Sequence, residues 1–167
     1  QMFREKTGQK IDWTDPFHPA FIFHIKNADR AYKNYQFTQN FATGELKASW
    51  DDDEGHWERK LFISRPDDVI VMEITGPKGK VGGSFSMDLT HKLIETETQV
   101  ANGEIKTHAT YVHGKGGYDN VVRIIPTGGE MTNDESSITV SQADKILIVM
   151  QVDNWKTPLP ESQSEVW

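Results

Sequence analysis

The sequence contains no cysteine, which excludes disulfide bonds, thiolate metal ligands and cysteine nucleophiles. It has no apolar run near the roughly 20 residues of a membrane-spanning helix, and no signal-peptide pattern at its start. Positive charge is also scarce, because 18 Lys and Arg face 25 Asp and Glu, a net charge of −7. We therefore expect neither a nucleic acid nor a membrane as a partner.

A helical pattern is missing as well, since no segment shows apolar residues at i, i+3 and i+4. Short runs rich in Val, Ile and Phe alternate instead with turn residues at intervals of roughly 8–12 positions. This pattern predicts an all-β, super-sandwich-like antiparallel β-sandwich of about ten strands with little or no helix. Strands are expected over residues 17–25, 32–41, 45–50, 57–63, 69–74, 85–89, 93–99, 105–112, 120–125, 138–140 and 145–152.

Residues 57–74 predict a β-hairpin at the centre of this fold. Pro66 belongs in its turn, because proline has a fixed φ and no N–H to donate to a strand ladder. The outgoing run is apolar on both faces except at Glu73, as expected of a central strand covered on both sides. Residues 145–152 have the same character. We expect four side chains in these two runs to be nearly fully buried: Ile70, Met72, Ile146 and Ile148.

The ends of the chain are more polar than its middle, and three parts are predicted. Residues 1–16 form a lead-in segment, residues 17–152 the β-sandwich domain, and residues 153–167 a C-terminal linker or tail containing two prolines. Because the chain opens on Gln rather than Met, we expect it to be a processed product or an excised piece of a longer protein.

Two loops contain candidate binding residues. Trp50 and Trp57 flank an acidic loop, residues 51–55, which is predicted to be a solvated hairpin tip because it is too short for a helix-flanked calcium loop. The two tryptophans are either a platform on which a sugar stacks or a cross-strand pair that packs in the core. In the glycine-rich loop 113–118, His113 and Tyr118 could contact a ligand, unless the loop is only a flexible connection.

No motif for a metal or for covalent catalysis is present. The six histidines lack zinc-ligand spacing, and no G-x-S-x-G occurs. We therefore expect no metal and no cofactor. Paired carboxylates, such as those of glycosidases, leave no sequence motif and remain open.

Residues 32–74 resemble the N-terminal β-domain of glycoside hydrolase family 95. The matching pieces are Thr43-Gly44-Glu45, Trp57-Glu58-Arg59, Phe62-Ile63-Ser64 and residues 66–71. A similar but more common pattern follows in Asn102-Gly103, Gly128-Gly129 and Ala143-Asp144, so that the resemblance covers about residues 17–152.

The resemblance implies an α-L-fucosidase or α-galactosidase type of parent enzyme, periplasmic or secreted. In that family the catalytic residues lie on a separate (α/α)6 barrel downstream, and none of them maps onto this chain. The implied role is therefore non-catalytic: the domain supports the barrel, its expected partner. The alternative is a stand-alone carbohydrate-binding module with carbohydrate as partner, and an independent enzyme is a third candidate. An aromatic row on one sheet face would favour the module, and a large uncovered apolar face would favour the supporting domain.

Overall fold

The computed structural model describes residues 17–89, 91–112 and 116–155, and these residues form twelve strands and no helix. The all-β prediction is therefore confirmed. None of the described residues forms a helix that could cross a membrane. The strands are β1 (Ile22–Lys26), β2 (Lys33–Asn40), β3 (Glu45–Asp51), β4 (His56–Ser64), β5 (Val69–Thr75), β6 (Val81–Asp88), β7 (Ile94–Ala101), β8 (Glu104–Tyr111), β9 (Gly117–Thr127), β10 (Glu130–Asn133), β11 (Ser137–Ala143) and β12 (Lys145–Trp155).

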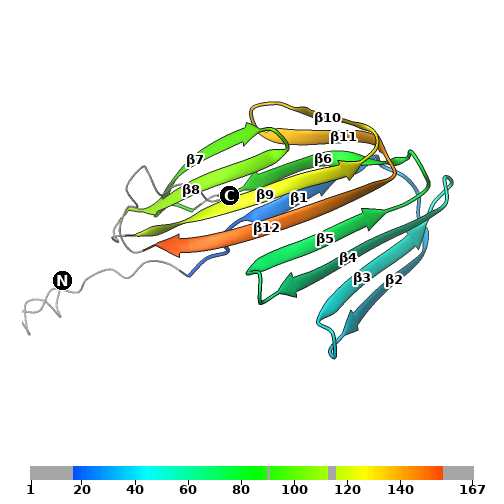
Figure 1. Ribbon diagram of the computed structural model, residues 1–167, viewed down its shortest axis with the longest axis horizontal. Helices are drawn as coiled ribbons and strands as arrows, with labels where there is room; N and C mark the ends of the chain where they lie inside the picture. The colour runs from blue at the N-terminus through cyan, green and yellow to red at the C-terminus, as the bar shows by residue number, and fades with distance from the viewer. Residues whose placement is uncertain (1–16, 90, 113–115, 156–167) are drawn as a thin grey trace, which may run out of the picture.

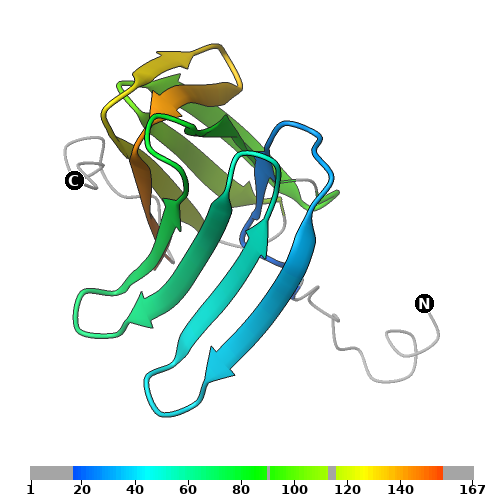
Figure 2. The ribbon, with the colours of Figure 1, turned by 90° about the vertical axis from the view of Figure 1, so that its right-hand side faces the viewer.

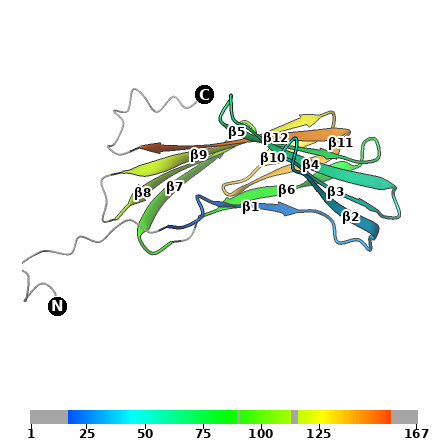
Figure 3. The same ribbon diagram turned by 90° about the horizontal axis from the view of Figure 1, so that it is seen from below.

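The strands form two antiparallel sheets of unequal size (Figure 1). The larger sheet has the order β2-β3-β4-β5-β12-β9-β8-β7, and the smaller has the order β1-β6-β11-β10. Seen from below, β1 and β6 lie in a layer of their own beside the large sheet (Figure 3). Alternating apolar side chains of both sheets point into the space between these layers, as in other β-sandwiches.

The predicted hairpin lies at the centre of the large sheet. β4 pairs with β5 from Glu58 opposite Thr75 to Ser64 opposite Val69, and β5 pairs on its other side with β12. β12 in turn pairs with β9 over its full length. Both apolar runs are thus central strands, as predicted. Among the described residues, however, no second layer covers their outer face, and Val71, Leu147 and Val149 are half-buried there, so the predicted cover on both faces is not found.

The hydrophobic core lies where the small sheet covers the large one. Ile146 and Ile148 of β12 are 0% exposed, and Met72 of β5 is 9% exposed, as predicted. Ile70 is only half-buried, so the prediction of near-complete burial is wrong for this residue. It lies in an open apolar groove of about 540 Å³ beside β1, the edge strand of the small sheet. The cover over β5 is therefore incomplete.

β2, β3 and much of β4 extend beyond the small sheet (Figure 2). Every residue of β2 is exposed, although the sequence predicts one buried face for this strand. The side chains on its inner side have no second layer to pack against: Phe37 is 59% exposed, and Ile63 of β4 is 64% exposed.

The small sheet departs most from the predicted strands. β10 was not predicted, because all four of its residues are exposed and none belongs to an apolar alternation. β6 begins at Val81 and includes Gly82 and Gly83, which lie before the predicted strand 85–89. These glycines allow close approach of neighbouring backbone: a Cβ on Gly82 would lie 2.7 Å from the Val140 carbonyl oxygen.

Candidate functional site

A pocket of about 640 Å³ lies at the edge of the sandwich, where the β1–β2 connection faces the β3–β4 hairpin and β11. Its volume falls in the range of about 300–1,000 Å³ that is common for small-molecule sites. Four aromatic side chains line it, namely Tyr32, Tyr35, Trp50 and Trp57. Aromatic faces with polar groups between them are suited to binding the apolar face and the hydroxyls of a sugar.

The two tryptophans named by the sequence analysis meet in this pocket. Trp50 of β3 and Trp57 of β4 are directly opposite one another in the register, and both are half-buried. Gly76 leaves room for Trp57, because a Cβ at this position would lie 2.4 Å from the indole ring. The Trp57 Nε1 is buried without a hydrogen-bond partner of good geometry. The pair is thus both part of the sheet packing and a wall of the pocket, and sugar binding by it stays a prediction.

Arg59 lies two residues after Trp57, on the same side of β4, and also lines the pocket. Its guanidinium carbon is 5.8 Å from the centre of the Trp50 ring, within cation–π range. Burial lowers the pKa of Arg59, and nearby Tyr35 opposes this effect. The Arg59 Nε is buried without a hydrogen-bond partner.

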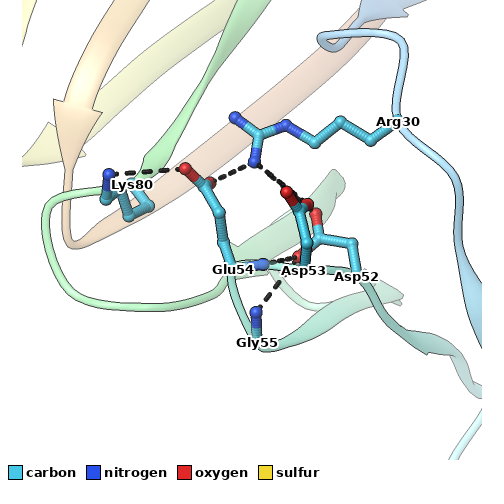
Figure 4. A network of polar contacts seen from close by, with 6 residues as sticks. All are labelled: Arg30, Asp52, Asp53, Glu54, Gly55 and Lys80. Atoms are coloured by element: carbon cyan, nitrogen blue, oxygen red, sulfur yellow. Dashed lines mark hydrogen bonds and ion pairs between the residues drawn. The ribbon is translucent and has the colours of Figure 1, made fainter.

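A network of ion pairs closes the pocket on the side of the acidic loop (Figure 4). Arg30, from the β1–β2 connection, lies 2.5 Å from a Glu54 oxygen and within 4 Å of Asp52 and Asp53. Lys80, just before β6, lies 3.3 Å from the other Glu54 oxygen. The network joins three loops that are far apart in the sequence. It therefore fixes the segment that leads to Tyr32 and Tyr35.

This network corrects the prediction of a solvated acidic tip. Only Asp53 behaves as predicted, with a side chain that is 85% exposed. The Asp52 side chain is 4% exposed, and its Oδ1 accepts hydrogen bonds from the amides of Glu54 and Gly55. The loop differs from the prediction because Arg30 and Lys80 approach it from other parts of the chain.

The electrostatics of Asp52 do not suit acid catalysis. Burial disfavours its charged form, but the Trp57 indole, the two loop amides and Arg30 outweigh this effect, so the pKa of Asp52 lies below its usual value. A general acid at neutral pH needs a raised pKa instead. Asp52 therefore serves to hold the loop rather than to donate a proton.

Two strand irregularities flank the pocket, and sequence reasoning missed both. The β2–β3 register shifts between Lys33 and Gln36, and Asn34 there has φ +56°. The β6–β11 register shifts between Val140 and Ala143, and Gln142 there has φ +57° and lines the pocket. Left-handed conformations of residues other than glycine are costly, and they occur frequently beside functional sites. The only sequence signal is Asn at position 34, a residue that tolerates this conformation.

The other two candidate residues are not part of this pocket. His113 lies outside the described residues. Tyr118, at the start of β9, pairs with Asn154 near the end of β12, whereas the pocket lies near the start of β12, roughly 30 Å away along the strand. Tyr118 is 4% exposed, its hydroxyl has no partner, and burial raises its pKa to about 12. Ligand binding by His113 and Tyr118 stays a prediction.

Histidine and carboxylate groups do not gather into a metal site within the described ranges: no three of them are placed to share an ion. Two of the histidines pair with single carboxylates instead. His56 lies 2.7 Å from Asp51, and His108 lies 2.6 Å from Asp119 while stacking on Trp155.

The family model of the glycosyl hydrolase family 65 N-terminal domain matches residues 2–155. The chain belongs to this family. The predicted class, an N-terminal β-domain of a glycoside hydrolase, is thereby confirmed, but the matching model is that of family 65 and not that of family 95. The match also includes most of the segment 1–16 that the sequence analysis separated from the sandwich. The predicted domain boundaries stay predictions.

Comparison with solved structures supports the fold, with fourteen matching chains. One is a putative kojibiose phosphorylase from human microbiome, with a TM-score of 0.56 and 7% sequence identity. The alignment covers 86% of this chain and 23% of that protein. At this identity the match shows a shared fold alone, and the chain spans about a quarter of the length of the protein it matches. No curated protein matches the sequence.

Proposed function

We propose that this chain is the non-catalytic N-terminal domain of a carbohydrate-active enzyme and supports a separate catalytic barrel. The observation that carries this proposal is the family match over residues 2–155. The partial alignment with the phosphorylase supports it, because the shared fold makes up 23% of that much longer chain.

The uncovered part of the large sheet offers a surface for such a barrel. The inner side of β2–β4 presents four apolar side chains, Phe37, Leu46, Leu61 and Ile63. Leu46 lies opposite Leu61, and Phe37 lies opposite Ala48, the next residue on this side of β3. Ile63 follows Leu61 on the same side of β4. Phe37 and Ile63 are more than half exposed. A contiguous apolar face is unusual on a free monomer and typical of an interface. We therefore place the interface with the barrel on this face.

The substrate and location of the parent enzyme are finer proposals. The resemblance to family 95 implies a fucoside or a galactoside as substrate and a periplasmic or secreted enzyme. The family model that matches the chain, however, is that of family 65. An assay series with aryl α-L-fucoside, α-galactoside and α-glucoside on the whole parent enzyme would separate these alternatives.

A second candidate function is carbohydrate binding by the domain itself. The specific observation in its favour is the pocket lined by four aromatic side chains beside Arg59. This function does not compete with support of a barrel, because the pocket and the apolar face use different parts of the inner surface.

The first test asks whether the chain alone is active. Inverting hydrolysis of a glycoside needs an acid and a base about 6.5–9.5 Å apart, and the shifted carboxylates here have lowered pKa values. We expect no release of nitrophenol from aryl glycosides by the purified chain. Turnover that disappears on replacing a single Asp or Glu would overturn the non-catalytic role.

The second test asks which face contacts the barrel. Ile63→Asp places a charge on the uncovered inner face, and Phe62→Asp places the same charge on the opposite face of the same strand. In the whole parent enzyme we expect Ile63→Asp to lower the melting temperature and Phe62→Asp to have less effect. In the isolated chain we expect Ile63→Asp to change little, because Ile63 is 64% exposed there. A larger effect of Phe62→Asp in the parent enzyme would move the interface to the outer face.

A further inference from the structure

Arg59 is a cation without a counter-charge. Among residues 17–89, 91–112 and 116–155, no carboxylate lies within ion-pair distance of it. Its Nε is buried without a hydrogen-bond partner. A half-buried guanidinium in this state is unfavourable unless another group satisfies it, because a charged group loses its hydration on burial. Arg59 therefore lacks an ion-pair partner, although Asp29 and Asp52 line other parts of the same pocket.

The other two cations of the pocket are already neutralised. Arg30 is held by Asp52, Asp53 and Glu54, and Lys80 is held by Glu54 (Figure 4). The positive charge that remains for a ligand is thus confined to the one planar guanidinium of Arg59. Such a group binds the two oxygens of a carboxylate side by side.

Flat apolar surfaces lie next to this guanidinium. The Trp50 ring is 5.8 Å from the Arg59 carbon, and Tyr35, which influences the pKa of Arg59, is 57% exposed. Asn27 and Gln142 on the pocket wall provide amide groups for hydrogen bonds to hydroxyls. The pocket therefore combines stacking faces, hydroxyl partners and one site for a carboxylate.

We propose that this pocket binds a sugar residue that bears a carboxylate, a uronic acid unit of an oligosaccharide. The carboxylate pairs with Arg59 and the sugar ring stacks on the aromatic side chains. The inference rests on the second candidate function and names its ligand class. It does not depend on the role as a supporting domain.

The arrangement favours a carboxylate over a sulfate or phosphate group. Those tetrahedral anions are usually held by several cations or by a row of backbone amides. Here Arg30 and Lys80 are engaged with carboxylates, and Asp52 lies in the same pocket. The larger negative charge of a phosphate would be repelled more strongly by the Asp52 carboxylate. A ligand with a single carboxylate needs only Arg59 as its counter-charge.

The test is calorimetric titration of the full chain with trigalacturonic acid and with its methyl ester, which has the same sugar rings but no charge. We expect the acid to bind at least about tenfold more tightly than the ester, since charge-assisted hydrogen bonds are the stronger ones. This preference should shrink on adding salt. Inorganic phosphate and sulfate, titrated separately, should bind more weakly than the acid.

Variants test whether the preference for the acid over the ester depends on Arg59. Arg59→Gln should remove the preference for the acid, and Arg59→Lys should retain part of it, because lysine keeps the charge but not the fork. Arg65→Gln, the same charge change in the exposed β4–β5 turn, should leave binding unchanged. Tyr35→Ala should weaken binding of acid and ester alike. Circular dichroism of each variant verifies that it is folded.

Three results would overturn the proposal. Equal binding of acid and ester would show that the pocket binds sugars without reading the carboxylate. Tighter binding of phosphate or sulfate than of the acid would show that it is a general anion site. Absence of binding to any probe by the folded chain would remove both this ligand and the carbohydrate-binding function, and it would leave the supporting role untouched.

Discussion

The large sheet has two halves with opposite character. In the half that the small sheet covers, Ile105, Val122, Ile146 and Ile148 are all 0% exposed. In the other half every residue of β2 is exposed, although its sequence alternates apolar and polar residues in the same way. The difference shows that alternation in the sequence determines which side chains share one face of the sheet. That face becomes part of a core only where a second layer of strands covers it.

The irregular features are also concentrated at one place, the border of the uncovered half. The left-handed residues Asn34 and Gln142 lie there, as does the ion-pair network around Arg30. Within the part of the chain that the structure describes, the other left-handed residues that are not glycine are Asp68 and Asn102, and both occupy hairpin turns, where this conformation is ordinary. We infer that the covered half provides stability, and the border is where the proposed binding pocket lies.

The largest expected effect is a difference in stability between matched substitutions in the two halves of the large sheet. Ile148→Ala removes side-chain volume from the covered half and should lower the free energy of unfolding by about 2–5 kcal/mol. Ile63→Ala is the matched change in the uncovered half and should cost less than about 1 kcal/mol, because little burial is lost. Urea denaturation of both variants measures the difference. Equal losses of unfolding free energy for the two variants would mean that the uncovered face is packed in solution and that the two halves do not differ in this way.

Much of the covered half could be predicted from the sequence. Residues 69–74 and 145–152 are apolar on both faces, a pattern typical of central strands, and β5 and β12 pair with a strand at each edge. Trp50 and Trp57 could be paired across a hairpin because each directly borders its tip. Both predictions depend on residues that are close together in the sequence, so the sequence alone was enough to make them.

The border could not be predicted, because it depends on contacts between distant segments. Arg30 reaches Asp52 and Glu54 from another connection, so the acidic loop looked solvated. Ile70 looked like its neighbour Met72, and only the position of the edge strand β1 leaves Ile70 partly uncovered. Gly82 and Gly83 of β6 lay outside the predicted strand because they have no side chain to continue its alternation. In the structure Gly82 admits the backbone of β11, and Gly83 admits the end of β1.

A smaller loss of stability is expected where the pocket wall packs against the large sheet. Gly76→Ala places a Cβ 2.4 Å from the Trp57 indole, and such overpacking costs about 1–3 kcal/mol. Trp57→Phe in the same chain should recover part of the loss, because the smaller ring leaves room. The double-mutant cycle, measured by urea denaturation, isolates this contact. If the two losses simply add, Trp57 moves freely and does not form a fixed wall of the pocket.

The smallest effect concerns Asp52, whose charge holds the network at the border. The folded-state pKa of Asp52 lies below its usual value of 3.8, with burial opposing and the Trp57 indole, loop amides and Arg30 favouring the charged form. Its contribution to stability is therefore present above pH 3.8 and is lost as the pH falls through the lower, folded-state pKa.

Asp52→Asn keeps the oxygen that accepts from the Glu54 and Gly55 amides but removes the charge. At pH 7 we expect it to cost about 1 kcal/mol or less, the range of a single ion pair. At an acidic pH below the lowered folded-state pKa of Asp52, the variant and the original chain should converge, since Asp52 has then lost its charge as well. Asp53→Asn, at a side chain that is 85% exposed, should change little at either pH. Urea denaturation at both pH values provides the comparison. A cost for Asp52→Asn that is the same in acid as at pH 7 would mean that the carboxylate acts through its shape and hydrogen bonds, and that the charge of this network does not hold the border of the pocket together.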